Sequence, residues 1–152
     1  MKVIAIIGCG RIANKHHLPN LTKIDEIRIK YACDLIEEKA VKAKSDFPKI
    51  ENVITDYKVA LSDPEVDAVY VLTPNFAHYT VTMDALKAGK HVFCEKPITV
   101  NYELSVKMAQ EAEKVGSFAE FTENILPRIA LSNYNTIQLM AIMSHPYYGS
   151  FG

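Results

Sequence analysis

The chain has 152 residues, of which 49% are hydrophobic and 23% are charged, and its formal net charge is −1. This is an ordinary globular composition with enough apolar residues for one full core, and the near-neutral charge without basic clusters argues against a nucleic-acid-binding protein. No apolar run approaches the roughly 20 residues needed to cross a bilayer, so we expect no membrane-spanning helix.

The cysteines and the amino-terminal residues indicate in which cellular compartment the protein is expected. Cys9, Cys33 and Cys94 are an odd number at wide spacings, which is typical of neither a disulfide framework nor a metal-binding knuckle. We interpret them as small buried side chains in a reducing environment. The apolar run at the start is too short for a signal peptide and no cleavage pattern follows it, so we expect a cytoplasmic protein.

Apolar runs alternate with segments of helical spacing along the chain. The expected strands are 3–7, 27–33, 52–54, 66–72, 91–95 and 117–122, and the expected helical segments are 11–23, 35–47, 57–61, 77–89 and 102–116. Continuous apolar strands that alternate with helices predict an α/β fold, a doubly wound and mostly parallel Rossmann sheet with helices on both faces. The alternation is lost between 122 and 128, so we predict a dinucleotide-binding domain over 1–122 and a separate tail over 123–152.

A glycine-rich turn follows the first expected strand. Residues 8–13 read GCGRIA and fit the pattern G-x-G-x-x-[GA] between a strand and a helix. Gly8 permits a tight turn, Gly10 leaves room for a pyrophosphate, and Ala13 lets the helix pack closely on the strand. The helix start then offers free N–H groups to the phosphates.

An acidic residue ends the second expected strand. Asp34 lies 24 residues after Gly10, where a carboxylate can accept hydrogen bonds from the adenosine ribose and repel a 2′-phosphate. The alternative is that the glycines only turn the chain and Asp34 caps the helix that begins at Leu35. The context favours nucleotide binding, with NAD preferred over NADP, although Lys30 and nearby basic groups could still accommodate a phosphate.

Two further polar segments follow expected strands. Thr73-Pro74-Asn75, with His78 shortly after, follows the strand 66–72, and Glu95-Lys96-Pro97 follows the strand 91–95. Ligands of open parallel sheets gather at the carboxyl ends of the strands. All four segments therefore converge on one predicted site.

The segments GCGRIANKHH (8–17) and TDYKVALSDPEVDAVYVLTPNFAHYTVTMDALKAGKHVFCEKPI (55–98) together resemble the N-terminal domain of the glucose-fructose oxidoreductase / inositol dehydrogenase / MocA family. The resemblance covers residues 1 to about 116, and the EKP tripeptide is its most specific part. It implies an NAD(P)-dependent oxidoreductase that transfers a hydride at a secondary alcohol of a sugar, cyclitol or similar polyol.

The resemblance also implies the roles of individual residues. Lys96 would be the catalytic residue near the nicotinamide ring, where it polarises the carbonyl or accepts the hydroxyl proton, and Pro97, in a trans or a cis bond, stiffens the backbone beside it. The residues implied to bind the cofactor are Gly8, Gly10, Arg11, Ile12, Asp34, Thr73, Pro74, Asn75, Glu95 and Lys96. A solvated surface cation is the alternative for Lys96. His78 either contacts the cofactor or supports the loop, and His16 and His17 are interpreted as packing or surface residues.

Members of that family continue into a second α/β domain, which covers the nicotinamide and mediates oligomerisation. Residues 123–152 resemble the beginning of that domain, so we interpret the chain as a truncated member, whose partners would be a polyol substrate and a second copy of itself. No metal ligand set is expected. A non-catalytic dinucleotide-binding module or sensor with the same fold is the alternative function.

Overall fold

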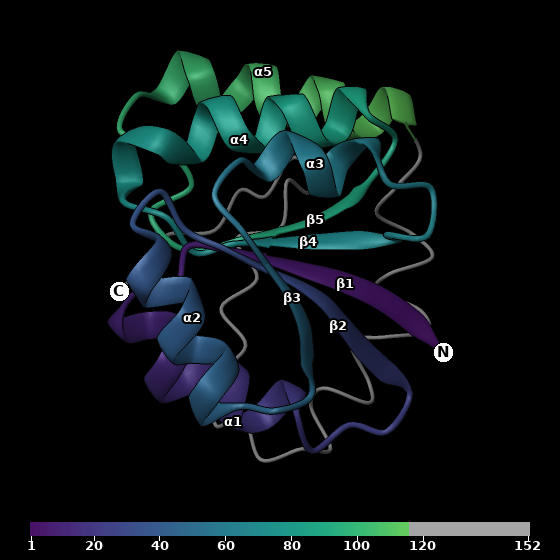
Figure 1. The fold of residues 1–152 in the computed structure, drawn as a ribbon. Helices are drawn as coiled ribbons and strands as arrows, with labels where there is room; N and C mark the ends of the chain where they lie inside the picture. The colour runs from purple at the N-terminus through teal and green to yellow at the C-terminus, as the bar shows by residue number, and fades with distance from the viewer. Residues whose placement is uncertain (116–152) are drawn as a thin grey trace.

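Five parallel strands form the centre of the fold in the computed structural model, which describes residues 1–115 (Figure 1). They are β1 (Lys2–Ile7), β2 (Ile27–Cys33), β3 (Ile50–Ile54), β4 (Ala68–Val71) and β5 (His91–Cys94). Their order in the sheet is β3-β2-β1-β4-β5, and each neighbouring pair is parallel. The order reverses between β1 and β4, which confirms the doubly wound Rossmann sheet and marks the place where such sheets bind ligands.

Helices cover both faces of this sheet (Figure 1). On one face lie a π-type turn η1 (Ala13–His17), α1 (Leu18–Leu21) and α2 (Glu37–Asp46). On the other lie α3 (Tyr57–Ser62), α4 (Asn75–Lys87) and α5 (Tyr102–Val115). Two layers of helices around a parallel sheet bury the central strands on both sides.

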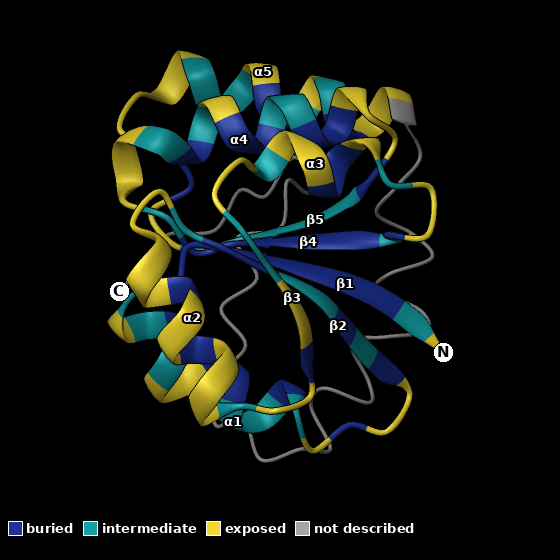
Figure 2. Ribbon diagram, viewed as in Figure 1, coloured by how far each residue is buried: buried dark blue, intermediate teal, exposed yellow. Residues whose placement is uncertain are grey.

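The core consists of two clusters that share β1, because successive residues of a strand point to opposite faces. Ile4 and Ile6 pack in the cluster that contains the buried leucines of α1, and Ile7 packs in the cluster that contains Val81 of α4. Figure 2 shows β1 and β4 buried almost along their whole length. This double burial explains why both strands read as continuous apolar runs.

The helix bounds differ from the sequence expectations in three places. The helix expected over 11–23 is split into η1 and α1, because Pro19 has no N–H to continue the regular pattern of hydrogen bonds. The helix expected from residue 77 already begins at Asn75, directly after Pro74, whose backbone is extended. The helix expected from residue 35 begins at Glu37, because Ile36 is still extended.

Some expectations fall outside the described residues. The strand expected at 117–122 and the tail 123–152 lie there. Within residues 1–115, no helix combines the length and the apolar composition needed to span a bilayer. The same residues contain no cluster of three or more His, Cys, Asp or Glu side chains suited to hold a metal ion.

Candidate functional site

A cavity of about 620 Å³ lies at the carboxyl ends of β1, β2 and β4. Its lining includes Gly8, Gly10, Arg11 and Ile12 after β1, Asp34 after β2, and Thr73 and Pro74 after β4. The structure thus brings together seven of the residues that the sequence assigned to the cofactor. Asn75, His78, Glu95 and Lys96 do not line this cavity.

Gly8 makes the turn after β1 compact. Its φ is +99°, a conformation that side-chain-bearing residues rarely adopt. A Cβ at this position would lie 2.7 Å from the carbonyl carbon of Leu72 and 2.8 Å from the backbone nitrogen of Thr73. Gly8 therefore allows the ends of β1 and β4 to approach each other closely.

Gly10 has a different environment. A Cβ here would meet no heavy atom of the described chain within 4 Å, and the residue lines the cavity. The Asn14 side chain fixes the turn, because its amide donates to the carbonyl oxygen of Cys9 at 2.7 Å and to that of Gly10 at 2.8 Å. The space over Gly10 is of the kind that a phosphate group needs, and sequence reasoning did not single out Asn14.

Asp34 connects the ends of β1 and β2. Its Oδ2 accepts a hydrogen bond from the N–H of Cys9 at 2.9 Å, and its Oδ1 accepts one from the N–H of Ile36 at 2.9 Å. The carboxylate still lines the cavity. It holds the glycine-rich turn while it faces the space where a ribose would lie.

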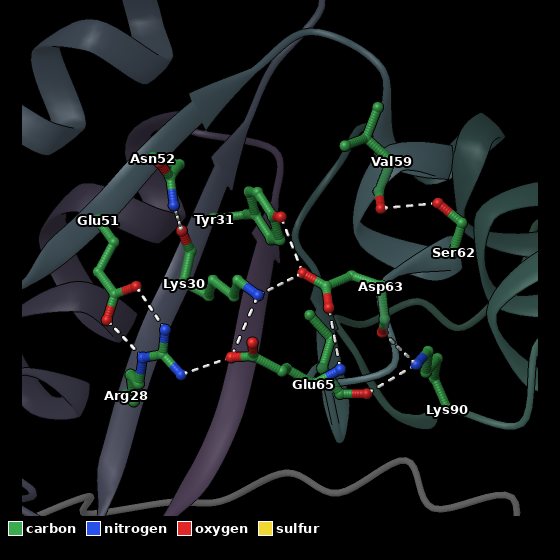
Figure 3. A network of polar contacts seen from close by, with 11 residues as sticks. Arg28, Lys30, Tyr31, Glu51, Asn52, Val59, Ser62, Asp63, Glu65 and Lys90 are labelled. Atoms are coloured by element: carbon green, nitrogen blue, oxygen red, sulfur yellow. Dashed lines mark hydrogen bonds and ion pairs between the residues drawn. The ribbon is translucent and has the colours of Figure 1, made fainter.

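Lys30 cannot accommodate a phosphate in this cavity, which corrects the expectation from sequence. Its Nζ lies 2.6 Å from Asp63 and 3.2 Å from Glu65, in the polar network drawn in Figure 3. The basic residues that do line the cavity are Arg11 and Lys39, the latter on the first turn of α2. Lys30 and Lys39 lie at similar distances in the sequence from Asp34, so the sequence alone does not indicate which of them lines the cavity.

Thr73 follows the carboxyl end of β4 and lines the cavity. Its hydroxyl is buried and has no hydrogen-bond partner among the described residues. A buried hydroxyl without a partner is costly unless a ligand or water completes it. Thr73 therefore fits a polar ligand.

His78 occupies the interior rather than the cavity. Its side chain is 1% exposed, and its Nδ1 and Nε2 each lie 2.8 Å from a backbone oxygen, that of Pro97 and that of Thr73 respectively. The ring lies within hydrogen-bonding distance of both carbonyl oxygens and can donate to at least one of them, so we interpret His78 as a support of the two loops. Asn75 is exposed at the start of α4.

The EKP segment follows β5. Glu95 accepts a hydrogen bond from the Lys96 N–H at 3.0 Å through Oε2, and its Oε1 lies 2.8 Å from Nε2 of His17. Lys96 is exposed, and its amine makes no hydrogen bond or ion pair with the described chain. The Lys96–Pro97 bond is cis.

Sequence reasoning missed the pairing of His17 with Glu95. His17 is 5% exposed, whereas the adjacent His16 is exposed. Burial lowers the pKa of His17, and the hydrogen bond with Glu95 opposes this shift. Two identical side chains in succession give no sequence signal for which one is buried.

The three cysteines are free; Cys9 and Cys33 are buried, as expected from the sequence, and Cys94 is half-buried. Burial raises the pKa of Cys9 and of Cys33 to about 12, and that of Cys94 to about 11. Thiols with such pKa values are poor nucleophiles near neutral pH. They contribute packing rather than chemistry to the site.

The comparison with protein families identifies the family of the chain. The family described as "Oxidoreductase family, NAD-binding Rossmann fold" (GFO_IDH_MocA) matches residues 2–121, and the chain belongs to this family. An inositol 2-dehydrogenase/D-chiro-inositol 3-dehydrogenase from Lactiplantibacillus plantarum is 34% identical over 114 residues, which are 74% of this chain and 32% of that protein.

The chain is also similar to a solved ketoreductase structure and, over a shorter stretch, to a glucan-branching enzyme. The crystal structure of KijD10, a 3-ketoreductase from Actinomadura kijaniata in complex with NADP and TDP-benzene, matches with a TM-score of 0.70 and 30% identity, over 76% of this chain and 35% of that one. In addition, 51 residues (34% of this chain) are 57% identical to a 1,4-alpha-glucan-branching enzyme of Solanum tuberosum, of which they cover 6%.

The site fits the dinucleotide that this family binds. The open space over Gly10, the carboxylate of Asp34 and the unpartnered hydroxyl of Thr73 meet the needs of a pyrophosphate, a ribose and a further polar group. The chain spans about a third of the length of the curated relatives it matches. It therefore contains the cofactor-binding part of such proteins, and an NAD(P) cofactor is the ligand that this part holds.

Proposed function

We propose that the chain is the cofactor-binding part of an NAD(P)-dependent dehydrogenase that acts on a secondary alcohol of a sugar, cyclitol or similar polyol. One observation carries this proposal: a single cavity gathers the glycine-rich turn, Asp34 and Thr73 at the point where the strand order reverses. Two similar proteins, an inositol 2-dehydrogenase/D-chiro-inositol 3-dehydrogenase and a 3-ketoreductase, support the substrate class.

The residues of the cavity would hold the cofactor in a defined direction. Backbone N–H groups of Arg11 and Ile12 would bind the pyrophosphate beside Gly10, and Asp34 would accept hydrogen bonds from the adenosine ribose. Because Asp34 also repels a 2′-phosphate, we propose NAD rather than NADP. Thr73, Pro74 and Asn75 would line the other half of the molecule, with Glu95 at the nicotinamide ribose.

Lys96 would be the catalytic residue. When bound, the nicotinamide supplies the acceptor or donor of a hydride. The exposed amine of Lys96 has no ion-pair partner within residues 1–115 and is free to exchange a proton with the substrate hydroxyl, as general acid–base catalysis requires. Pro97 and Glu95 fix the backbone on either side of it.

The alternative is a dinucleotide-binding module or sensor without catalysis, because a shared fold does not establish chemistry. Hydride transfer needs a substrate held close and in line, and this chain spans a third of the relatives' length. We therefore expect the 152-residue chain to bind NADH and to turn over polyols slowly.

A fluorescence titration with NADH, followed by activity assays, tests both proposals. Saturable binding that is weakened by Asp34→Ala but not by Asp25→Ala, an exposed acidic residue at a distance from the cavity, supports the cofactor site. Turnover that is abolished by Lys96→Ala but retained by the exposed Lys87→Ala supports the enzyme. Binding with no turnover of any polyol supports the sensor, and no binding of either cofactor contradicts both.

The tail carries a separate proposal: residues 123–152 lie outside the dinucleotide-binding domain and begin a second domain. Sequencing the transcript through and beyond this segment tests the proposal. A continuation related to the second domain of such oxidoreductases supports it, and a continuation unrelated to them contradicts it.

A further inference from the structure

Two buried histidines contact the EKP segment, one at each of its ends. His17 comes from η1, on one face of the sheet, and His78 comes from α4, on the other face. The two side chains are 5% and 1% exposed. Lys96 lies in the sequence between the two residues that they contact, Glu95 and Pro97.

The first anchor orients the carboxylate of Glu95. Nε2 of His17 lies 2.8 Å from Oε1, while Oε2 accepts the N–H of Lys96 at 3.0 Å. The imidazole is itself confined, because its ring packs edge-on against Phe93 of β5 and Tyr70 of β4, with centroid distances of 5.3 and 6.1 Å. His17 thus determines where the carboxylate points, and the carboxylate holds the backbone of Lys96.

The second anchor joins two loops of the site. The ring of His78 lies between the carbonyl oxygens of Thr73 and Pro97, at 2.8 Å from each. Thr73 belongs to the cavity, and Pro97 directly follows Lys96. The imidazole therefore links the cofactor-lining end of β4 to the segment that carries the amine.

We propose that His17 and His78 are positioning residues, which together fix the backbone of Lys96 relative to the cofactor cavity while leaving its side chain free. This inference rests on the proposed function, because it takes Lys96 as the reacting group. A geometry that is fixed before binding favours catalysis, since a displacement of the reacting group by about 1 Å can cost about 100-fold in rate. A histidine that only fills the core would have no such directed effect.

The test uses leucine and glutamine variants of each histidine in the full 152-residue chain. Leucine removes the polar contacts at similar volume, and glutamine restores an amide that can donate to one oxygen. His16→Leu is the matched control, since His16 is the exposed neighbour of His17. Circular dichroism and thermal unfolding of each variant exclude a collapse of the fold.

The first measurement is amide hydrogen exchange without cofactor. In His17→Leu we expect the Lys96 amide to exchange at least about fivefold faster, because its acceptor carboxylate loses its orientation. The Glu95 amide, which donates to the carbonyl oxygen of Val71 at 3.0 Å within the sheet, is the internal reference and keeps its rate. His17→Gln restores most of the protection, and His16→Leu changes neither amide.

The second measurement compares the affinities for NADH and ADP-ribose, which lacks the nicotinamide. We expect His17→Leu and His78→Leu to weaken NADH binding by about three- to tenfold more than ADP-ribose binding, because the affected segment serves the nicotinamide end. Equal losses for both ligands, or no loss, together with unchanged Lys96 exchange, would overturn the positioning role. If the unmodified chain binds neither ligand, the proposed function fails, while the exchange rates still decide whether His17 holds the Lys96 backbone.

Discussion

Gly8 and Gly10 serve different purposes although they are one residue apart. A side chain at Gly8 would collide with the backbone of Leu72 and require a left-handed conformation, whereas a side chain at Gly10 would enter the open cavity. One glycine is therefore required by the fold and the other by the ligand. The pattern G-x-G predicts both positions and does not separate their roles.

This contrast predicts opposite effects of two alanine variants. Gly8→Ala should destabilise the fold by about 1–3 kcal/mol through backbone strain and overlap with Leu72, seen as a lower midpoint of thermal unfolding. Gly10→Ala should leave the midpoint nearly unchanged and weaken NADH binding at least about tenfold. A Gly10→Ala variant that binds NADH normally would mean that no phosphate group lies over this residue.

We expect the choice between NAD and NADP to depend on Asp34 and Lys39. Replacing Asp34 with serine removes the charge that repels a 2′-phosphate and leaves Lys39 in the same cavity. We expect Asp34→Ser to shift the ratio of NADPH to NADH affinity by about tenfold toward NADPH, measured by fluorescence titration.

The double variants supply the control for this prediction. Asp34→Ser with Lys39→Ala should lose the shift if the Lys39 cation, rather than that of Arg11, which also lines the cavity, contacts the 2′-phosphate. Asp34→Ser with Lys42→Ala should keep it, since Lys42 pairs with Asp46 and does not line the cavity. Equal ratios in the two double variants would exclude Lys39 as the phosphate contact.

At the scale of secondary-structure elements, the strands were the most predictable part. The runs 3–7 and 27–33 agree with β1 and β2 within one residue, because β1 is a nearly unbroken apolar run and the first residues of β2 alternate between buried and half-buried positions. The π-type turn at Ala13–His17 was not predictable, since it arises from the missing N–H of Pro19 combined with the packing of His17. Contacts between distant segments, such as His17 with Glu95, leave no periodic signal at all.

Charged side chains form a network beside β2, between the chain segments that precede β4 and β5. Figure 3 shows Lys30 of β2 in contact with Asp63 and Glu65, while Lys90 donates to the backbone oxygens of Asp63 and Val66 at 2.7 and 2.8 Å. The network ties β2 to the turn that precedes β4. It therefore supports the two strands whose carboxyl ends carry Asp34 and Thr73.

This network predicts a dependence of stability on pH. The hydrogen bond from Lys30, with those from the Glu65 N–H and the Tyr31 hydroxyl, lowers the pKa of Asp63 to about 2. A carboxyl group with a lowered pKa in the folded state contributes stability that is fully present above its unfolded value and is lost as the pH falls toward about 2. Asp63→Asn should lower the unfolding midpoint by roughly 5 °C at pH 7, with a smaller difference at each step from pH 4 to pH 2.

The control for this prediction is Asp25→Asn. The Asp25 side chain is 95% exposed and lies 3.2 Å from Lys49, so its removal should change the midpoint little at any pH. A difference for Asp63→Asn that stays constant down to pH 2 would show that the charge of Asp63 is not its source.

At the scale of the whole molecule, the parallel sheet places residues distant in sequence at one edge. Asp34, Thr73 and the glycine-rich turn converge there because parallel strands end on the same side, and this convergence was predictable from the strand assignments alone. The arrangement of the EKP segment beside the cavity was implied by the family resemblance, and its two histidine anchors required the structure.

The most direct test is a crystal structure of the chain grown with NADH. We expect the diphosphate against the N–H groups of Arg11 and Ile12 over Gly10, the adenosine ribose at Asp34, and the nicotinamide on the side where the amine of Lys96 can reach a bound hydroxyl. A dinucleotide bound elsewhere, or one whose nicotinamide lies out of reach of Lys96, would contradict the proposed function.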